Sequence, residues 1–134
     1  MDQTDDRGAR LKITDWVIRA AVAFVFVASG LEKFGIGGGR EWVGIFARIG
    51  WGDWFRYLTG VLEVLGGVLL MTPIASTAGA VLLVSCMVGA ILAHIFKLRD
   101  PFSSIINILL IIAIVVAGRK PRAEAEEIKG LQLE

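Results

Sequence analysis

The sequence predicts an all-α integral membrane protein, a bundle of four transmembrane helices with a short amphipathic interfacial helix between the first and second. Three observations predict this fold class. Hydrophobic residues make up 55% of the 134 residues, and the mean hydropathy is +0.68. The apolar residues come in long blocks without polar stripes, and the charges gather at the two ends and in one loop. Such blocks are typical of membrane spans, because backbone groups in hydrocarbon must form hydrogen bonds within their own segment.

Four apolar blocks give the predicted spans, at about residues 13–34, 55–71, 74–96 and 102–117. Aromatic side chains stand near the ends of the blocks, where the membrane meets water. The connections after the second and third blocks are short, so neighbouring helices should run antiparallel. Residues 119–134 form a polar tail, and the whole chain, 1–134, is expected to be a single membrane domain.

The interfacial helix is predicted in the loop between the first two spans. A glycine-rich break, "GIGGG", leads into "REWVGIFARIG". Helical spacing places apolar residues near one side of the second segment: Trp42, Val43, Ile45, Phe46 and Ile49. Its charged residues lie elsewhere, so this segment is expected to lie on the membrane surface.

Composition also excludes several classes of function. The net charge is only +1, so no nucleic-acid partner is expected. The lone cysteine, Cys86, makes no internal disulfide or dithiol pair. The lone histidine, His94, makes no multi-histidine metal site or bis-histidine haem site. We therefore expect no metal site, and no cofactor is evident from the residues.

Charged and polar residues inside the predicted spans are the candidate functional residues. Five of them fall in one half of the membrane: Glu32 and Lys33 from the first span, Glu63 from the second, His94 from the third and Asn107 from the fourth. Arg19 lies towards the other side. Glu63 shares a helix face with Gly60 and Gly67, and small residues favour close helix contact. A charge at this depth normally faces a partner or a polar cavity.

Each candidate also has a simpler interpretation. Glu32 can mark the membrane boundary, while Lys33 and Arg19 can extend their charges to the interface. His94 can cap its helix, and Asn107 can join two helices by a hydrogen bond. The sequence assigns no catalytic residue, and the predicted ligand-binding residues are Lys33, Glu63, His94, Asn107 and Arg19.

The chain resembles the DoxX family of small bacterial membrane proteins. The resemblance rests on "SGLEKF" at the end of the first span, "LEVLGG" in the second, "AHIF" at the end of the third, and Arg19. It covers about residues 14–118 and implies a four-helix membrane fold with Lys33, Glu63 and His94 at family-type positions. It also implies a link to quinone-coupled or oxidative-stress redox systems.

Two functions remain open at this stage. The chain is either an accessory subunit of a membrane redox system that binds a quinone in a polar intramembrane pocket, or a non-enzymatic membrane protein. In the second case it binds or transports an apolar small molecule, or serves as a scaffold. The expected surroundings are the lipid bilayer of the bacterial inner membrane, with a redox partner or further copies of the chain. The distribution of Lys and Arg favours cytoplasmic termini.

Overall fold

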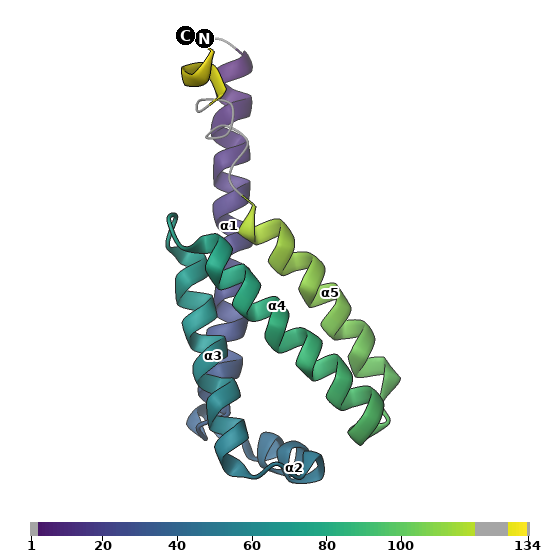
Figure 1. Cartoon of the computed structure of the whole chain (residues 1–134). Coiled ribbons are helices and arrows are strands. Elements are labelled where there is room, and N and C mark those ends of the chain that lie inside the picture. The colour runs from purple at the N-terminus through teal and green to yellow at the C-terminus, as the bar shows by residue number, and fades with distance from the viewer. Residues whose placement is uncertain (1–2, 120–128, 134) are drawn as a thin grey trace.

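The chain folds into long helices that pack side by side, with a short helix lying across one end of them (Figure 1). The computed structural model describes residues 3–119 and 129–133. Its elements are α1 (Gln3–Glu32), η1 (Ile36–Gly38), α2 (Arg40–Ile49), α3 (Asp53–Met71), α4 (Ser76–Ala93), η2 (His94–Leu98) and α5 (Pro101–Gly118). No strand occurs in these residues, so the prediction of an all-α protein is confirmed.

All four predicted spans are helical. Three segments are long and apolar enough to cross a membrane: Asp53–Met71, Ser76–Leu98 and Pro101–Gly118. The first predicted span, 13–34, lies mostly inside α1, which begins much earlier than predicted, at Gln3. The polar leader continues the helix because its residues support it, for example through the Asp6–Arg10 ion pair at 3.1 Å, one turn apart. Of the predicted polar tail, residues 120–128 and 134 lie outside the described residues.

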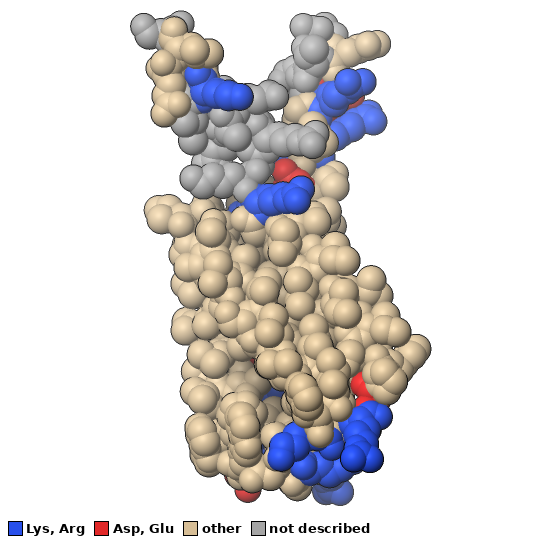
Figure 2. All heavy atoms as spheres, turned by 45° about the vertical axis from the view of Figure 1, so that its right-hand side comes forward, with Lys and Arg blue, Asp and Glu red and all other residues tan. Residues whose placement is uncertain are grey.

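The outer surface of the helices is apolar. Many large apolar side chains point outward, and Phe24 (75% exposed) and Phe102 (70% exposed) are examples. Figure 2 shows a broad band without charged side chains between Lys- and Arg-rich regions at the two ends of the molecule. Exposing such an apolar surface to water would be unfavourable, whereas contact with lipid tails is favourable because they are apolar as well. The chain is therefore a membrane protein.

Glycines allow α3 to pack tightly against both of its neighbours. A Cβ atom on Gly67 would lie 3.1 Å from the Ala23 carbonyl oxygen of α1. A Cβ on Gly79 of α4 would lie 2.6 Å from the Leu70 backbone nitrogen of α3. The predicted small-residue face of α3 thus meets α1, with Gly60 beside Gly30, while Gly66 meets α4.

The packed core lies near the α3–α4 turn. Leu70, Leu83 and Ile114 come from three helices and are fully buried there. Beyond this core α4 and α5 lean away from α1 and α3, while α2 lies across the far end of the molecule (Figure 1). The molecule is therefore closely packed at one end and more open at the other.

The connection between α4 and α5 is an irregular helical turn rather than the short loop that the sequence predicts. The chain stays helical through η2, which is a π-helix. Each hydrogen bond of a π-helix spans one residue more than a hydrogen bond of an α-helix, so the turn is wider. It ends at Arg99, which has a left-handed backbone (φ 51°) and is followed by Asp100, the N-cap of α5.

Asp100 caps α5 and lies between two of the apolar segments, Ser76–Leu98 and Pro101–Gly118. Its carboxylate accepts hydrogen bonds from the Ser103 hydroxyl at 2.5 Å and from the backbone amides of Phe102 and Ser103. The Ser103 hydroxyl is the largest cause that lowers the pKa of Asp100 below its ordinary value, since it stabilises the ionised form. Asp100 and Pro101 thus begin α5 as a standard cap followed by proline.

Candidate functional site

A buried ion pair joins α1 to α3 near the open end. Lys33 Nζ lies 2.7 Å from Glu63 Oε2, and the two side chains are 2% and 4% exposed. Lys33 Nζ also donates to Ser29 Oγ at 3.0 Å, and Ser29 Oγ donates to the same Glu63 oxygen at 3.2 Å. The three groups form a closed triangle of hydrogen bonds, so the two opposite charges compensate each other inside the protein.

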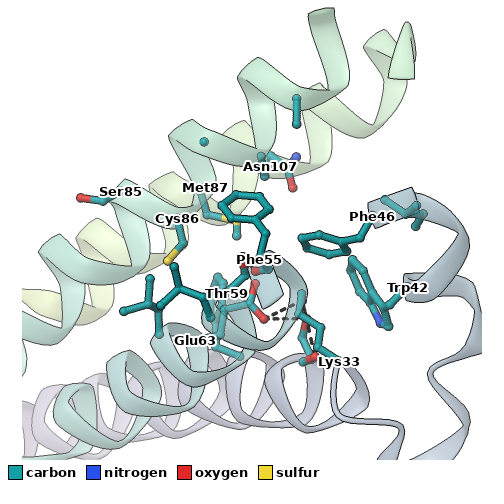
Figure 3. Close-up of a pocket in the computed structure, with 18 of the residues that line it drawn as sticks. Lys33, Trp42, Phe46, Phe55, Thr59, Glu63, Ser85, Cys86, Met87 and Asn107 are labelled. Carbon is teal, nitrogen blue, oxygen red and sulfur yellow. Dashed lines mark hydrogen bonds and ion pairs between the residues drawn. The ribbon is translucent and has the colours of Figure 1, made fainter. Parts of the chain in front are cut away.

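Trp42 of α2 covers the ammonium group of Lys33. The nitrogen lies 3.7 Å from the centre of the indole ring, a close cation–π contact. The indole nitrogen in turn donates to Glu32 Oε2 at 3.1 Å. These contacts hold α2 over the end of α1 and place an aromatic side chain on the charged pair (Figure 3).

Arg56 supports the pair from the start of α3. Its guanidinium donates to the Lys33 backbone oxygen, just past the C-terminal end of α1, and lies 3.5 Å from Asp53 Oδ1. It also lies 4.4 Å above the ring of Tyr57 and is only 6% exposed. A cation at a helix C-terminus offsets the negative end of the helix dipole, so Arg56 fixes the segment that carries Lys33.

The ion pair faces a cavity of about 400 Å³. Residues from α1, α2, α3, α4, η2 and α5 line it. Most of the lining is apolar or aromatic, and Figure 3 shows Phe46 and Phe55 projecting into the region between the ion pair and α5. This volume and lining are in the range of small-molecule sites, which combine apolar walls with a few polar groups.

His94 and Asn107 line the same cavity from η2 and α5. His94 Nδ1 and Asn107 Nδ2 are buried, and neither has a hydrogen-bond partner within the described part of the chain. In Figure 3, Asn107 points into the cavity from the side away from Lys33 and Glu63. Buried polar atoms without partners are uncommon in folded proteins, so these two call for an explanation.

The structure brings four of the five predicted ligand-binding residues to one cavity, namely Lys33, Glu63, His94 and Asn107. It places Arg19 elsewhere. Arg19 is 4% exposed, stacks on Trp16 and donates to the carbonyl oxygens of Ala117 and Arg119, each at 3.2 Å. Arg19 therefore caps the C-terminus of α5 near the packed end and is not part of the cavity lining.

Sequence reasoning missed three residues of the site. Ser29 lies one turn before Lys33 on the same helix face, and Arg56 lies seven residues before Glu63 on the face that carries Gly60. Both spacings are visible in the sequence and could have found these residues. Trp42 was assigned to the membrane surface, and its contact with Lys33 depends on the path of the glycine break, which spacing does not predict.

The site combines an ammonium, a carboxylate and an imidazole around an apolar space. Both bonds to Glu63 end on Oε2, so within the described residues Oε1 has no recorded donor. Such a site can bind an oxygen-bearing ring, donate hydrogen bonds to it and exchange a proton with it. No cluster of three or more His, Cys, Asp or Glu suited to a metal ion occurs in the described residues.

Comparison with known proteins gives two matches. The model of the DoxX-like family matches residues 17–118. A protein of Bacillus subtilis (strain 168) named "Putative oxidoreductase CatD" is 30% identical over 86 residues. That match covers 64% of this chain and 61% of the relative, so the chain spans less than two thirds of the relative's length. No solved structure matches the chain.

The family match includes Arg19 and the four predicted residues that line the cavity, Lys33, Glu63, His94 and Asn107. The resemblance carried by "SGLEKF", "LEVLGG" and "AHIF" is thereby confirmed. The chain belongs to the DoxX-like family.

Proposed function

We propose that the protein is an accessory subunit of a membrane redox system and binds a quinone-type ring in the cavity beside Lys33 and Glu63. The observation that carries the proposal is a fully buried, hydrogen-bonded ion pair facing an apolar cavity. The name of the Bacillus subtilis relative, which contains "oxidoreductase", supports a redox link.

The chemistry of quinones suits these side chains. Reduction of a quinone consumes two electrons and two protons and gives a quinol. Glu63 can accept or deliver a proton at Oε1, and Lys33 can donate a hydrogen bond to a ring oxygen once Trp42 moves aside. The electrons come from a partner protein, for which we propose a membrane redox enzyme.

The proposed placement is in the bacterial inner membrane with four crossings, α1 being the fourth. Its 30 residues are more than enough to span a bilayer of about 30 Å, and a long stretch after Arg19 is uncharged. In this arrangement α2 lies at the membrane interface below the cavity, and the termini face the cytoplasm. Assembly with a redox partner or with further copies of the chain is part of the proposal.

The experiment is extraction of native membranes into lipid nanodiscs, followed by chemical analysis of bound quinone. We expect a stoichiometric quinone in the wild type and in the control Thr14→Ala, which lies outside the cavity and whose hydroxyl bonds only the backbone of its own helix. The double variant Lys33→Met, Glu63→Met removes both charges together, so it should fold and lose the quinone. Quinone no higher than in nanodiscs of lipid alone would contradict the proposal.

One observation favours a second candidate, a non-enzymatic membrane protein that binds or transports an apolar molecule or serves as a scaffold. Lys33, Glu63 and Ser29 satisfy one another without any ligand and join α1 to α3. In that case the double variant would keep its fold and its bound lipids unchanged, and neither it nor the wild type would hold quinone.

A further inference from the structure

The cavity has polar groups at two separate places, and only those at one place form hydrogen bonds with one another. At the α1–α3 side, Lys33, Glu63 and Ser29 bond one another. Asn107 lies at the other side in Figure 3, on α5, which η2 contacts. Asn107 Nδ2 and His94 Nδ1, at the start of η2, are both buried without a partner among the described residues. An amide carries donors on its nitrogen and an acceptor on its oxygen, so either orientation of Asn107 leaves a buried polar atom without a bond.

The second pair is held in place by an irregular backbone. His94 begins the π-helix η2, and its carbonyl oxygen accepts from the backbone nitrogens of both Arg99 and Asp100. The wide turn ends in the left-handed Arg99, a conformation that is unfavourable for a residue with a side chain. Turns of this width are common where an α-helix ends. Here the turn begins at His94, which lines the same cavity as Asn107 of α5.

The space between the two polar places is aromatic. Phe46 and Phe55 have ring centres 5.7 Å apart and lie between Asn107 and the Lys33–Glu63 pair in Figure 3. Aromatic side chains stack well on a flat ring. A flexible chain with one polar end would satisfy only one of the two places.

We propose that the ligand is a flat ring with oxygen atoms at opposite ends, a para-quinone or its quinol, and that His94 and Asn107 bind the end remote from Lys33 and Glu63. This inference rests on the proposed function and narrows it. Asn107 donates to the remote oxygen through Nδ2, and His94 Nδ1 donates or accepts according to whether the ligand is quinone or quinol. The near oxygen meets the Lys33 ammonium or Glu63 Oε1.

The test compares two probes on the protein in nanodiscs: a short-tailed para-quinone and a phenol with the same tail, which has a single oxygen. The variants are Asn107→Leu, similar in size, and the control Thr14→Ala, which lies outside the cavity. We expect Asn107→Leu to weaken para-quinone binding by about tenfold, the effect of one lost hydrogen bond, and to leave phenol binding unchanged. Thr14→Ala should change neither.

Stability without probe separates a ligand contact from a structural one. Because Asn107 Nδ2 has no described partner, Asn107→Leu should unfold at the same temperature as the wild type or higher. Lower stability together with equal weakening of both probes would mean that Asn107 serves helix packing, and would overturn the inference.

The outcomes also distinguish this inference from the proposed function. If the para-quinone binds and depends on Lys33 and Glu63 but not on Asn107, the inference fails and the proposed function stands. If the wild type binds neither para-quinone nor quinol, both fail. A His94→Phe variant repeats the comparison at the second residue, with the same expected loss for the para-quinone alone.

Discussion

The two ends of α4 have opposite surroundings, although the helix is apolar along its whole length. Near its start, Gly79 is in backbone contact with α3, and Leu83 is fully buried. Near its end, a Cβ atom on Gly89 would have no neighbour within 4 Å, and Gly89 lines the cavity. Hydropathy alone does not distinguish these ends, because lipid, core and cavity all accept the same apolar residues. The packed end is the one at which the small residues of α4 contact a neighbouring helix.

Polar groups differ between the two ends in the same way. At the packed end Arg19 finds the backbone oxygens that end α5. At the open end the Lys33–Glu63 pair is bonded, but three buried nitrogens have no partner within the described chain, namely Arg56 Nε, His94 Nδ1 and Asn107 Nδ2, and the last two belong to residues that line the cavity. The packed end therefore uses its polar groups within the protein, whereas the open end retains buried nitrogens without partners in the described chain. Four predictions test this contrast.

The largest effect is expected at the ion pair. Lys33→Met leaves the Glu63 carboxylate buried without its counter-charge and should cost about 3–5 kcal/mol of unfolding free energy. The double variant Lys33→Met, Glu63→Met should recover most of that loss, because it leaves no lone charge. Thermal unfolding of the purified protein in detergent measures both. Equal stability of the single and double variants would show that the pair is not coupled.

Arg19 should be the next most sensitive position. Arg19→Met removes two charge-assisted hydrogen bonds to the end of α5 and should cost about 1.5–3 kcal/mol. Binding of quinone in the open end should be unchanged, since Arg19 does not line the cavity. A variant that folds normally but loses bound quinone would place Arg19 in the ligand site after all.

Two glycines of one helix give a matched pair. Gly79→Ala puts a methyl group against the backbone of α3 and should cost about 1–3 kcal/mol as the helices separate. Gly89→Ala meets open space and should be neutral or stabilising by up to about 1 kcal/mol, because alanine favours helix. Unfolding temperatures compare the two, and similar losses at both positions would contradict the difference between the ends.

The smallest effect concerns pH and the cap of α5. Hydrogen bonding lowers the pKa of Asp100 in the folded protein, chiefly through the Ser103 hydroxyl. Its stabilisation is therefore complete above the pKa of the unfolded chain and is lost as the pH falls through the folded pKa. Unfolding temperatures measured from neutral pH to about pH 3 should fall less steeply for Asp100→Asn than for the wild type. Identical slopes would remove Asp100 as a source of acid sensitivity.

The sequence predicted much of the fold because apolar blocks and glycine spacing are local signals. The helices at 55–71, 74–96 and 102–117 were placed within a few residues, and Glu63 was expected on the small-residue face that meets α1. The π-turn after Ala93 could not be predicted, because "HIFKL" continues an ordinary helical pattern.

The site was predictable in part for the same reason. The predicted depth in the membrane placed four residues in the same half of the bilayer, and all four line the cavity: Lys33, Glu63, His94 and Asn107. Depth also separated Arg19 from them, yet Arg19 was included because a buried charge was expected to serve a ligand. Its actual partners are backbone oxygens, which no side-chain pattern reveals.

The π-turn makes one residue of this connection dispensable, because the turn holds one residue more than an α-helical turn. Deleting a single residue from Ile95–Leu98 would close it to a regular helical turn and leave the facing sides of α4 and α5 unchanged. His94 and Asn107 would still line the cavity. Natural chains of this family that are one residue shorter here should therefore keep the asparagine, which a survey of their sequences can check.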